Sequence, residues 1–238
     1  MKTDPSVQRS GRLWGNDWRM ARGGAGLLLA VVLLAACPLA GAAPGGAVQW
    51  SADFEAAEPG KLPEGMLVVD GAFAVRLDGA NKVLELPGNP LESYGVLFGP
   101  AESAGLEVSA RIRGTRQGRR MPAFGVGLNG VGGFRLQASP ARRALELFRD
   151  NRLLAQAPFT WQSSQWMQFR LRVRALDGQW RVEGKAWTTG QPEPADWMIR
   201  HMTSVQPPAG RASIWGFPFA GTPIQFDDLA VRAVPDEK

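Results

Sequence analysis

The sequence predicts an all-β fold: a two-sheet antiparallel jelly-roll sandwich, preceded by a signal peptide. From residue 48 onward, apolar and polar side chains alternate with a period of two, as in strands with one face on a core and one in water. These runs are short and bounded by glycine, proline, asparagine or aspartate, and no segment has the apolar period of an amphipathic helix. Many short strands separated by turns are typical of β-sandwiches and jelly rolls.

The N-terminal segments are expected to be distinct from this sandwich. Residues 1–19 are polar and lack apolar periodicity, so they predict a disordered extension, and Met20 is an alternative start. Residues 20–36 predict a signal peptide, because Arg19 and Arg22 precede a short apolar stretch. An apolar stretch of this length is too short for a transmembrane helix.

Cys37 is the only cysteine, and it follows Leu34-Ala35-Ala36. This pattern is typical of bacterial lipoproteins, so we expect a lipid on Cys37 and a flexible tether over residues 37–47. The domain would then be held on the periplasmic side of a bacterial membrane. Cleavage after Ala42 is the alternative, and it would release a secreted or periplasmic protein without a lipid. A single cysteine excludes an internal disulfide and a thiolate zinc site.

The β-sandwich is expected over residues 48–234, with its strands in regular succession. In the segment 107–113, Val108, Ala110 and Ile112 alternate with charged or hydroxyl side chains. In the segment 167–174, four arginine or glutamine side chains alternate with four apolar ones. The same pattern predicts strands over residues 73–77, 83–86, 95–98, 124–128, 134–138, 145–148, 213–216 and 224–231.

One hairpin is predicted residue by residue. Asp177-Gly178 favours a two-residue turn of type I′, which requires positive φ at both positions. Closure on this turn aligns the flanking strands in a single register. The expected inward pairs are Val173 with Val182, Leu171 with Gly184 and Phe169 with Ala186, after Leu176 with Gln179 next to the turn.

The outward side of this hairpin carries many charges. The pairs are Arg174 with Arg181, Arg172 with Glu183 and Arg170 with Lys185, and two of these three are like-charged. Either other groups neutralise these charges or the face meets an anion, and side chains that extend into solvent are the simplest expectation. The alternation also predicts Trp180 in the core and Trp187 on the outward side.

Charge and composition exclude several classes of function. Residues 1–36 carry five basic and two acidic side chains, so they account for +3 of the net charge of +5 and leave +2 for the rest. This balance does not favour nucleic-acid binding. His201 is the only histidine and lies in an apolar stretch, so we interpret it as a packed or surface residue. Gly125, Gly127 and Gly130 are spaced as in a phosphate loop, but no helix follows them.

No catalytic residues are predicted. Jelly-roll glucanases use a tight Glu-x-Asp-x-(x)-Glu spacing, which this sequence lacks. Asp227 and Asp228 are adjacent, so in a regular strand they would face opposite sides. One of them is expected to pair with the segment around Asp53-Phe54-Glu55 or to help hold a structural calcium ion. We predict no other cofactor, and the question of enzyme activity stays open, with a preference against it.

Flat aromatic rings and arginine forks are the predicted ligand-binding groups. Indole rings suit the C–H face of a sugar, and guanidinium groups suit carboxylate or sulfate groups. The candidates are Trp187, Trp197 and Trp215, together with Arg119 and Arg120 in the most densely charged loop. The same residue types are common at protein interfaces, so a protein partner is also consistent with them.

Several segments resemble the concanavalin A-like lectin/glucanase superfamily, near the 3-keto-disaccharide hydrolase (LamG-like) group and the modules that accompany periplasmic quinoprotein-type β-propellers. The similar segments are Asp53-Phe54-Glu55 with Pro59-Gly60, Arg113-Gly114-Thr115 with Arg119-Arg120-Met121-Pro122, Gly184-Lys185-Ala186-Trp187 with Glu193-Pro194-Ala195-Asp196-Trp197, and Phe226-Asp227-Asp228-Leu229. The resemblance implies a jelly-roll fold, and sugar as the ligand class by analogy.

The predicted function is therefore that of an exported, membrane-anchored module that binds carbohydrate or another component of the cell envelope without catalysis. Two alternatives stay open. One is a glycoside-acting hydrolase of the 3-keto-disaccharide hydrolase type, which the resemblance implies. The other is a protein-interaction scaffold of the envelope.

Overall fold

The computed structural model describes residues 46–89 and 92–235. The predicted extension, the signal peptide and Cys37 lie outside these residues. Within the described part, no helix is long and apolar enough to cross a membrane. The one helical element described there is the short 3₁₀ turn η1 (Pro140–Arg142).

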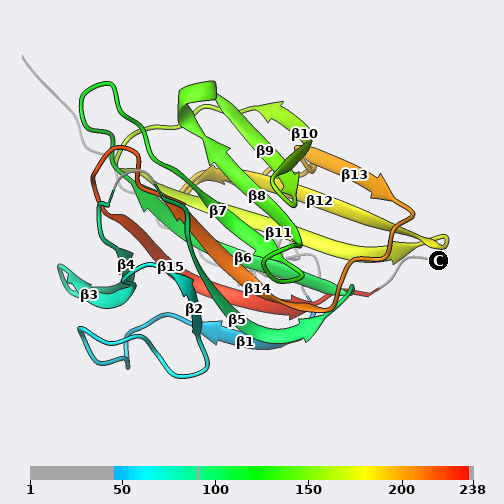
Figure 1. The fold of residues 1–238 in the computed structure, drawn as a ribbon, viewed down its shortest axis with the longest axis horizontal. Helices are drawn as coiled ribbons and strands as arrows, with labels where there is room; N and C mark the ends of the chain where they lie inside the picture. Colours follow the sequence, from blue (N-terminus) through cyan, green and yellow to red (C-terminus); the bar gives the residue numbers. More distant parts are fainter. Residues whose placement is uncertain (1–45, 90–91, 236–238) are drawn as a thin grey trace, which may run out of the picture. The chain divides into compact units, whose positions relative to one another are not determined.

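The described chain forms two stacked antiparallel sheets (Figure 1). One has the order β13 (Ile199–Thr203), β12 (Gln179–Thr188), β11 (Trp166–Leu176), β6 (Leu106–Gly114), β15 (Ile224–Ala233), β4 (Asn81–Leu86), β3 (Ala74–Asp78), with β1 (Val48–Ala52) on the C-terminal half of β15. The other has the order β10 (Arg152–Pro158), β9 (Ala144–Arg149), β8 (Phe134–Ser139), β7 (Ala123–Leu128), β14 (Gly210–Phe217), β5 (Tyr94–Glu102), β2 (Leu67–Asp70). The predicted all-β sandwich is confirmed.

The core lies between the sheets and follows the alternation of the sequence. Phe169 and Leu171 of β11 are fully buried, as are Phe124 and Val126 of β7 in the opposite sheet. The rings of Phe124 and Phe169 meet edge to face, with their centroids 5.9 Å apart. Burial of each such side chain contributes about 1.5–3 kcal/mol to folding, so this layer is the main source of stability.

The predicted hairpin forms in the expected register. Asp177 (φ 48°) and Gly178 (φ 73°) make the turn, and every predicted pair of β11 and β12 is present. Leu171 faces Gly184 across the pair. A Cβ atom at position 184 would lie 2.6 Å from Cδ1 of Leu136 in the opposite sheet, so a larger residue there would require the Leu136 side chain to move.

The outward side of this hairpin is not open to solvent, contrary to the simplest expectation. Glu183 and Lys185 are only 1% and 5% exposed. The segment 189–198 folds back over β12, and Lys185 Nζ donates to Pro194 O at 2.7 Å and pairs with Glu193 Oε1 at 2.7 Å. The charges are therefore neutralised within the fold, which was the other predicted alternative.

Trp180 also differs from its prediction. It lies near the end of β12 next to the turn, where the sheet extends past the core, and it is only partly buried. Among the described residues, it is not one of those that pack in or against the hydrophobic cluster. The alternation predicts which side of β12 Trp180 faces. It does not predict where along β12 the opposite sheet ends.

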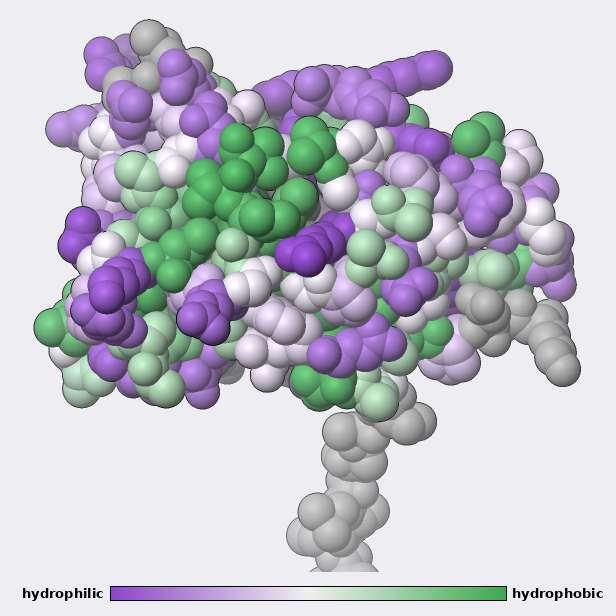
Figure 2. All heavy atoms as spheres, turned by 60° about the horizontal axis from the view of Figure 1, so that its bottom comes forward, coloured by the Kyte–Doolittle hydropathy of each residue, from purple (hydrophilic) through white to green (hydrophobic). Residues whose placement is uncertain are grey.

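One edge of the seven-stranded sheet is apolar. Figure 2 shows a hydrophobic area on the side of the molecule that lies at the bottom of Figure 1. On this side the edge strand β2 exposes three consecutive apolar residues, Leu67, Val68 and Val69. Exposed apolar edges are uncommon in sheets because they can pair with another chain.

Candidate functional site

An open pocket of about 510 Å³ lies at one end of the sandwich, and we call it the end pocket. It lies between the loop that joins β6 to β7, the turn η1 and the loop that follows β10. Its volume is within the range of small-ligand sites in proteins. The residues that line it are Arg116, Met121, Pro140, Arg143, Phe159, Thr160, Trp161, Gln162 and Ser163.

Hydrogen bonds between the loops fix the walls of the end pocket. The backbone N–H of Arg116 donates to Ser163 Oγ at 3.0 Å. The backbone N–H of Phe159 donates to Arg143 O at 2.9 Å, and Arg143 itself closes η1 with a left-handed φ of 53°. Both arginine side chains are exposed and have no ion pair with any described residue.

Trp161 forms the apolar wall of the end pocket. Its ring packs edge to face on Phe124, with the centroids 6.3 Å apart, so it is anchored to the core. Its indole Nε1 is buried and has no hydrogen-bond partner in the described structure. A buried donor without a partner costs about 1–3 kcal/mol.

The outer face of the seven-stranded sheet carries a group of aromatic and polar side chains. Trp215 is only 6% exposed, and its Nε1 donates to Ser213 Oγ at 2.9 Å. Its indole packs closely on the neighbouring strands, because a Cβ atom on Gly95 would lie 2.8 Å from its six-membered ring. A Cβ atom on Gly127 would lie 3.2 Å from its Nε1.

Arg135 of β8 lies beside Trp215 on this face. Its Cζ is 5.6 Å from the ring centroid of Trp215, 5.2 Å from that of Phe148 and 5.1 Å from that of Phe217. Nη2 donates to Asn151 Oδ1 at 3.2 Å. Burial lowers the pKa of the Arg135 guanidinium below its ordinary value.

A chain of polar side chains runs from this face toward the end pocket. Gln137 Nε2 donates to Ser139 Oγ at 3.0 Å, and Ser139 Oγ donates to Glu146 Oε2. Glu146 is fully buried, and its other oxygen lies 3.3 Å from Nη1 of Arg142 in η1. Glu146 is thus a structural carboxylate, which supports the turn that forms one wall of the end pocket.

The five predicted ligand residues do not come together in one place. Arg119 and Arg120 are exposed in the turn at the tip of the β6–β7 loop, which the backbone pair of Gln117 and Arg120 closes. Trp187 and Trp197 are on the outward side of the eight-stranded sheet, whereas Trp215 is on the outer face of the other sheet.

The two tryptophans of the eight-stranded sheet contact basic side chains. The ring of Trp197 lies 4.3 Å from Cζ of Arg172 and 4.8 Å from Nζ of Lys185. That of Trp187 lies 6.0 Å from the same Nζ. Trp197 therefore forms part of the packing of segment 189–198 on β11 and β12.

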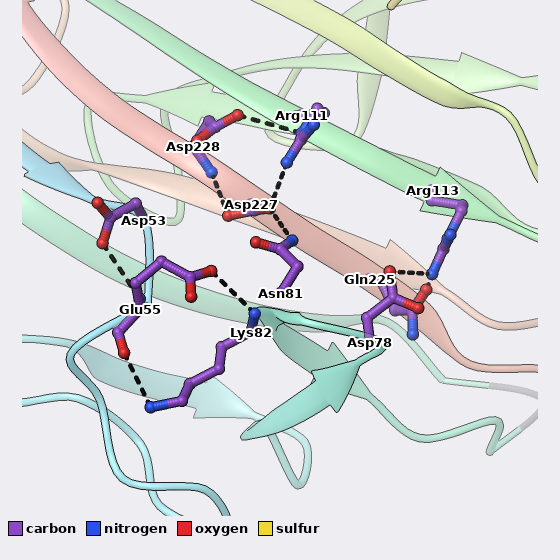
Figure 3. Close-up of polar contacts among 10 residues, drawn as sticks. All are labelled: Asp53, Glu55, Asp78, Asn81, Lys82, Arg111, Arg113, Gln225, Asp227 and Asp228. Carbon is purple, nitrogen blue, oxygen red and sulfur yellow. Dashed lines mark hydrogen bonds and ion pairs between the residues drawn. The ribbon is translucent and has the colours of Figure 1, made fainter.

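Asp227 and Asp228 share one partner, contrary to the expectation that they would face opposite sides. Asp227 Oδ2 accepts from Arg111 Nη2 at 2.5 Å and from Asn81 Nδ2 at 2.8 Å (Figure 3). Asp228 Oδ2 lies 3.1 Å from Nε of the same arginine. The reason is a bulge: Asp228 has a φ of 49°, and the pairing of β15 with β6 shifts between Asp227 and Ala230.

These carboxylates contribute to the structure of the sheet, and the contacts assign them no reaction. Asp227 is 1% exposed and its charge is balanced by Arg111. Burial, and then the nearby Asp227, raise the pKa of Asp228 above its ordinary value. Nearby, Glu55 Oε1 accepts from the backbone N–H of Lys82 at 2.9 Å (Figure 3). In residues 46–89 and 92–235, no three histidine, cysteine, aspartate or glutamate side chains are grouped so that they could hold a metal ion.

Sequence reasoning missed most of the residues that line the end pocket, and it missed Arg135, although it named Trp215 beside that arginine. Trp161 lies in a polar loop with no alternation, and an indole in such a loop was the only available signal. Arg116 lies in the densely charged loop that the sequence singles out, whereas Arg135 and Arg143 look like ordinary surface charges in the sequence. Their roles depend on loops and strands that meet only in the folded chain.

Comparison with solved structures shows the fold. The carbohydrate-binding module CBM66 from Bacillus subtilis aligns with a TM-score of 0.51 at 12% identity, over 71% of this chain and 96% of that one. The Emp46p carbohydrate recognition domain aligns at 0.55 and 10% identity, over 80% and 99%. A Bacillus subtilis protein of unknown function with a galectin-like fold aligns at 0.52 and 11% identity, over 81% and 99%.

No protein-family model and no curated protein sequence matches the chain. The solved structures named above confirm the predicted resemblance at the level of lectin-like jelly-roll folds.

Proposed function

We propose that this protein is a non-catalytic carbohydrate-binding module, exported and held at a membrane by a lipid on Cys37, and that it binds saccharide in the end pocket. The observation that carries the proposal is Trp161, which lines this pocket and whose buried indole N–H has no hydrogen-bond partner among the described residues. The finer relation to the 3-keto-disaccharide hydrolase group and to propeller-associated modules stays a prediction from the sequence.

The chemistry of the end pocket suits a sugar. Met121, Phe159 and Trp161 supply apolar surface for the C–H face of a pyranose ring. Ser163, Gln162 and Thr160 supply hydroxyl and amide groups that can exchange hydrogen bonds with sugar hydroxyls. Sugar sites in proteins combine these two kinds of surface.

The charge around the end pocket favours a saccharide with acidic groups. Arg116 and Arg143 border the pocket, and Arg119 and Arg120 extend the same positive loop. None of the four has an ion pair with a described residue, so their donors are available to a ligand. Arginine forks bind carboxylate and sulfate groups through two hydrogen bonds at once.

The solved structures support the proposal as neighbours in fold. Two of the three named above are described as carbohydrate-binding or carbohydrate recognition domains. At such low identity the likeness to these structures shows the fold alone. The ligand class proposed for this chain therefore depends on the side chains of the end pocket.

A glycan array followed by calorimetric titration tests the proposal. Trp161→Phe keeps a ring on Phe124 but removes the N–H, and we expect it to weaken the best saccharide by about tenfold, as the loss of one buried hydrogen bond implies. Trp187→Phe on the other sheet is the matched control and should bind as the wild type does. Wild-type binding by Trp161→Phe would place the site elsewhere: on Trp187, Trp197 or Trp215 if a variant of one of these residues loses affinity.

A protein-interaction role is the second candidate, and the edge strand β2 favours it. Its consecutive exposed residues Leu67, Val68 and Val69 could take up a partner strand by β-augmentation. Val68→Lys should abolish capture of an envelope protein by this route while saccharide binding in the end pocket is retained. A partner still captured by this variant would exclude β2 as the contact.

A further inference from the structure

Another open pocket lies on the eight-stranded sheet, near the turn of the β11–β12 hairpin, and we call it the arginine pocket. Its volume is about 560 Å³, and it shares no lining residue with the end pocket. Strands β11, β12 and β13 line it with four arginines and one carboxylate, which are Arg172, Arg174, Arg181, Arg200 and Glu183. Positive side chains therefore dominate the wall of a pocket that is large enough for a small ligand.

Three of these arginines share the single carboxylate. Glu183 Oε2 accepts from Arg172 Nε at 2.7 Å and from Arg174 Nη2 at 3.2 Å, and Oε1 accepts from Arg200 Nε at 3.3 Å. Asp196 lies 3.8 Å from Arg200 Nη2, but its side chain is 95% exposed, so solvent screens that pair. Arg172 and Arg200 alone therefore bring two positive charges to one buried negative charge.

The other end of the hairpin has a different charge balance. There, Lys185 is 5% exposed and has a carboxylate of its own, because Glu193 Oε1 lies 2.7 Å from its Nζ. Near the turn, by contrast, the excess of positive charge borders an open pocket.

The guanidinium of Arg172 is held from two directions. Its Nε is bound to Glu183, and its Cζ lies 4.3 Å from the ring centroid of Trp197, which also lines the pocket. Among the described residues, no other ion pair involves Arg172, and none of its nitrogen atoms is both buried and without a partner. The donors that Glu183 leaves free are therefore accessible, and their direction is fixed before a ligand binds.

The two guanidiniums suit an anion with more than two oxygen atoms. They lie on the two oxygens of the same carboxylate, so they are neighbours at the wall of the pocket. Arg172 can donate to two oxygens of a ligand, and Arg200, whose side chain is 56% exposed, can reach a third. A carboxylate has two oxygens, whereas a phosphate monoester has three terminal oxygens and a charge of about −1.5 to −2 at pH 7.

We propose that the arginine pocket binds the phosphate group of a phosphate monoester, with two of its oxygens on Arg172 and the third on Arg200. Trp197 and the 43% exposed Met202 give the same pocket apolar surface for the carbon-bearing part of the ligand. Glu183 is a positioning residue, because it orients both arginines. The site is independent of the saccharide site proposed for the end pocket.

Calorimetric titration at fixed ionic strength with glycerol 3-phosphate and glycerate tests this site without a sugar ring. The two compounds present a phosphate and a carboxylate on a similar three-carbon chain. Glycerol 3-phosphate should bind about tenfold more tightly, as one additional charge-assisted hydrogen bond implies. Equal affinity for the two compounds would overturn the proposal.

Two matched variants locate the phosphate. Arg200→Gln should weaken glycerol 3-phosphate about tenfold. Arg76→Gln removes the same charge from the exposed side of β3, at the opposite edge of the same sheet, and should bind as the wild type does. An equal loss in both variants, or a loss in Arg116→Gln with wild-type binding by Arg200→Gln, would overturn the proposal, and the latter would place the phosphate at the end pocket.

A measurement on the wild-type protein does not depend on the folding of any variant. The Nε–H resonance of Arg172 should shift on titration with glycerol 3-phosphate and stay in place with glycerol. A resonance that does not move at saturating glycerol 3-phosphate would overturn the proposal.

Vesicles distinguish the two sources of a phosphate monoester. Binding to phosphatidylcholine vesicles that requires added phosphatidic acid and is weakened in Arg200→Gln would identify a lipid headgroup as the ligand. Binding of glycerol 3-phosphate without binding to these vesicles would identify a soluble phosphate ester.

Discussion

Asp227 illustrates how one buried side chain can support several strands. It connects Asn81, the first residue of β4, to Arg111 of β6 from its own position on β15. Removal of its charge leaves Arg111 with only the half-exposed Asp228. The side chain therefore stabilises the part of the sheet where β4 and β6 pair with β15.

Substitution of these two carboxylates should give unequal effects. Asp227→Asn should lower the free energy of unfolding by about 2–3 kcal/mol, because it breaks a largely buried ion pair. Asp228→Asn should cost less than about 1 kcal/mol, because its side chain is 53% exposed and screened. Urea unfolding of the two variants provides the comparison, and equal losses would contradict the assignment of Asp227 as the structural partner.

His201 should make stability depend on pH. Burial, and then the charge of Arg149, lower its pKa in the folded protein below the ordinary 6.5. The unfolded chain therefore binds the proton more readily, and stability should fall as the pH drops from 6.5 toward the lower folded value.

Urea unfolding at pH 7.5 and pH 5 measures this effect. In His201→Gln the loss of stability between these two pH values should be smaller than in the wild type. Glu107 has a raised pKa through burial and acts with the opposite sign, so the wild type and the variant must be compared at the same pH values. An equal loss in both proteins would exclude His201 as the source.

At the scale of elements, the β11–β12 hairpin joins the core to a charged outer layer. Leu171 points into the core, and its neighbour Arg172 donates from Nε to Glu183 at 2.7 Å while its guanidinium stacks on Trp197. The two sides of one strand therefore both contribute to stability.

Alanine substitutions along β11 should reflect this arrangement. Leu171→Ala should cost about 2–5 kcal/mol because it leaves a cavity in a packed core. Arg172→Ala should cost about 1–3 kcal/mol, since it leaves the buried Glu183 with fewer donors. Arg119→Ala, on the exposed loop, should stay within about 0.5 kcal/mol. Thermal unfolding ranks the three, and an Arg172→Ala protein as stable as Arg119→Ala would mean that the outer layer contributes nothing.

Local patterns were enough to predict this hairpin, but other elements required the folded chain. The period of two and the Asp177-Gly178 turn involve neighbours in sequence, so the register followed directly. The bulge at Asp228 breaks the alternation through its backbone conformation, which the residue types do not reveal. Segment 189–198 and the loop with Trp161 have no periodicity, and their positions depend on distant strands.

At the scale of the whole molecule, the sequence predicts that a lipid on Cys37 anchors the chain to a membrane. Cys37 lies outside the described residues, so its modification stays a prediction. Mass spectrometry of the N-terminal peptide should find Cys37 as the first residue with a diacylglyceryl group, and Cys37→Ser should release the protein from membranes. A mature N-terminus at Ala43 without lipid would contradict this and would favour a secreted protein.

The pairing of β1 with β15 brings the first and last described strands side by side. Val48 lies opposite Arg232, and the backbone N–H of Ala233 donates to Ala47 O at 2.9 Å. The first and last described residues therefore lie close together in the fold, so a short peptide could link residue 235 to residue 46. New ends opened at the exposed Asp177-Gly178 turn would give a circular permutant with the same sheets. The same adjacency would allow the domain to be inserted as a cassette into a surface loop of another protein.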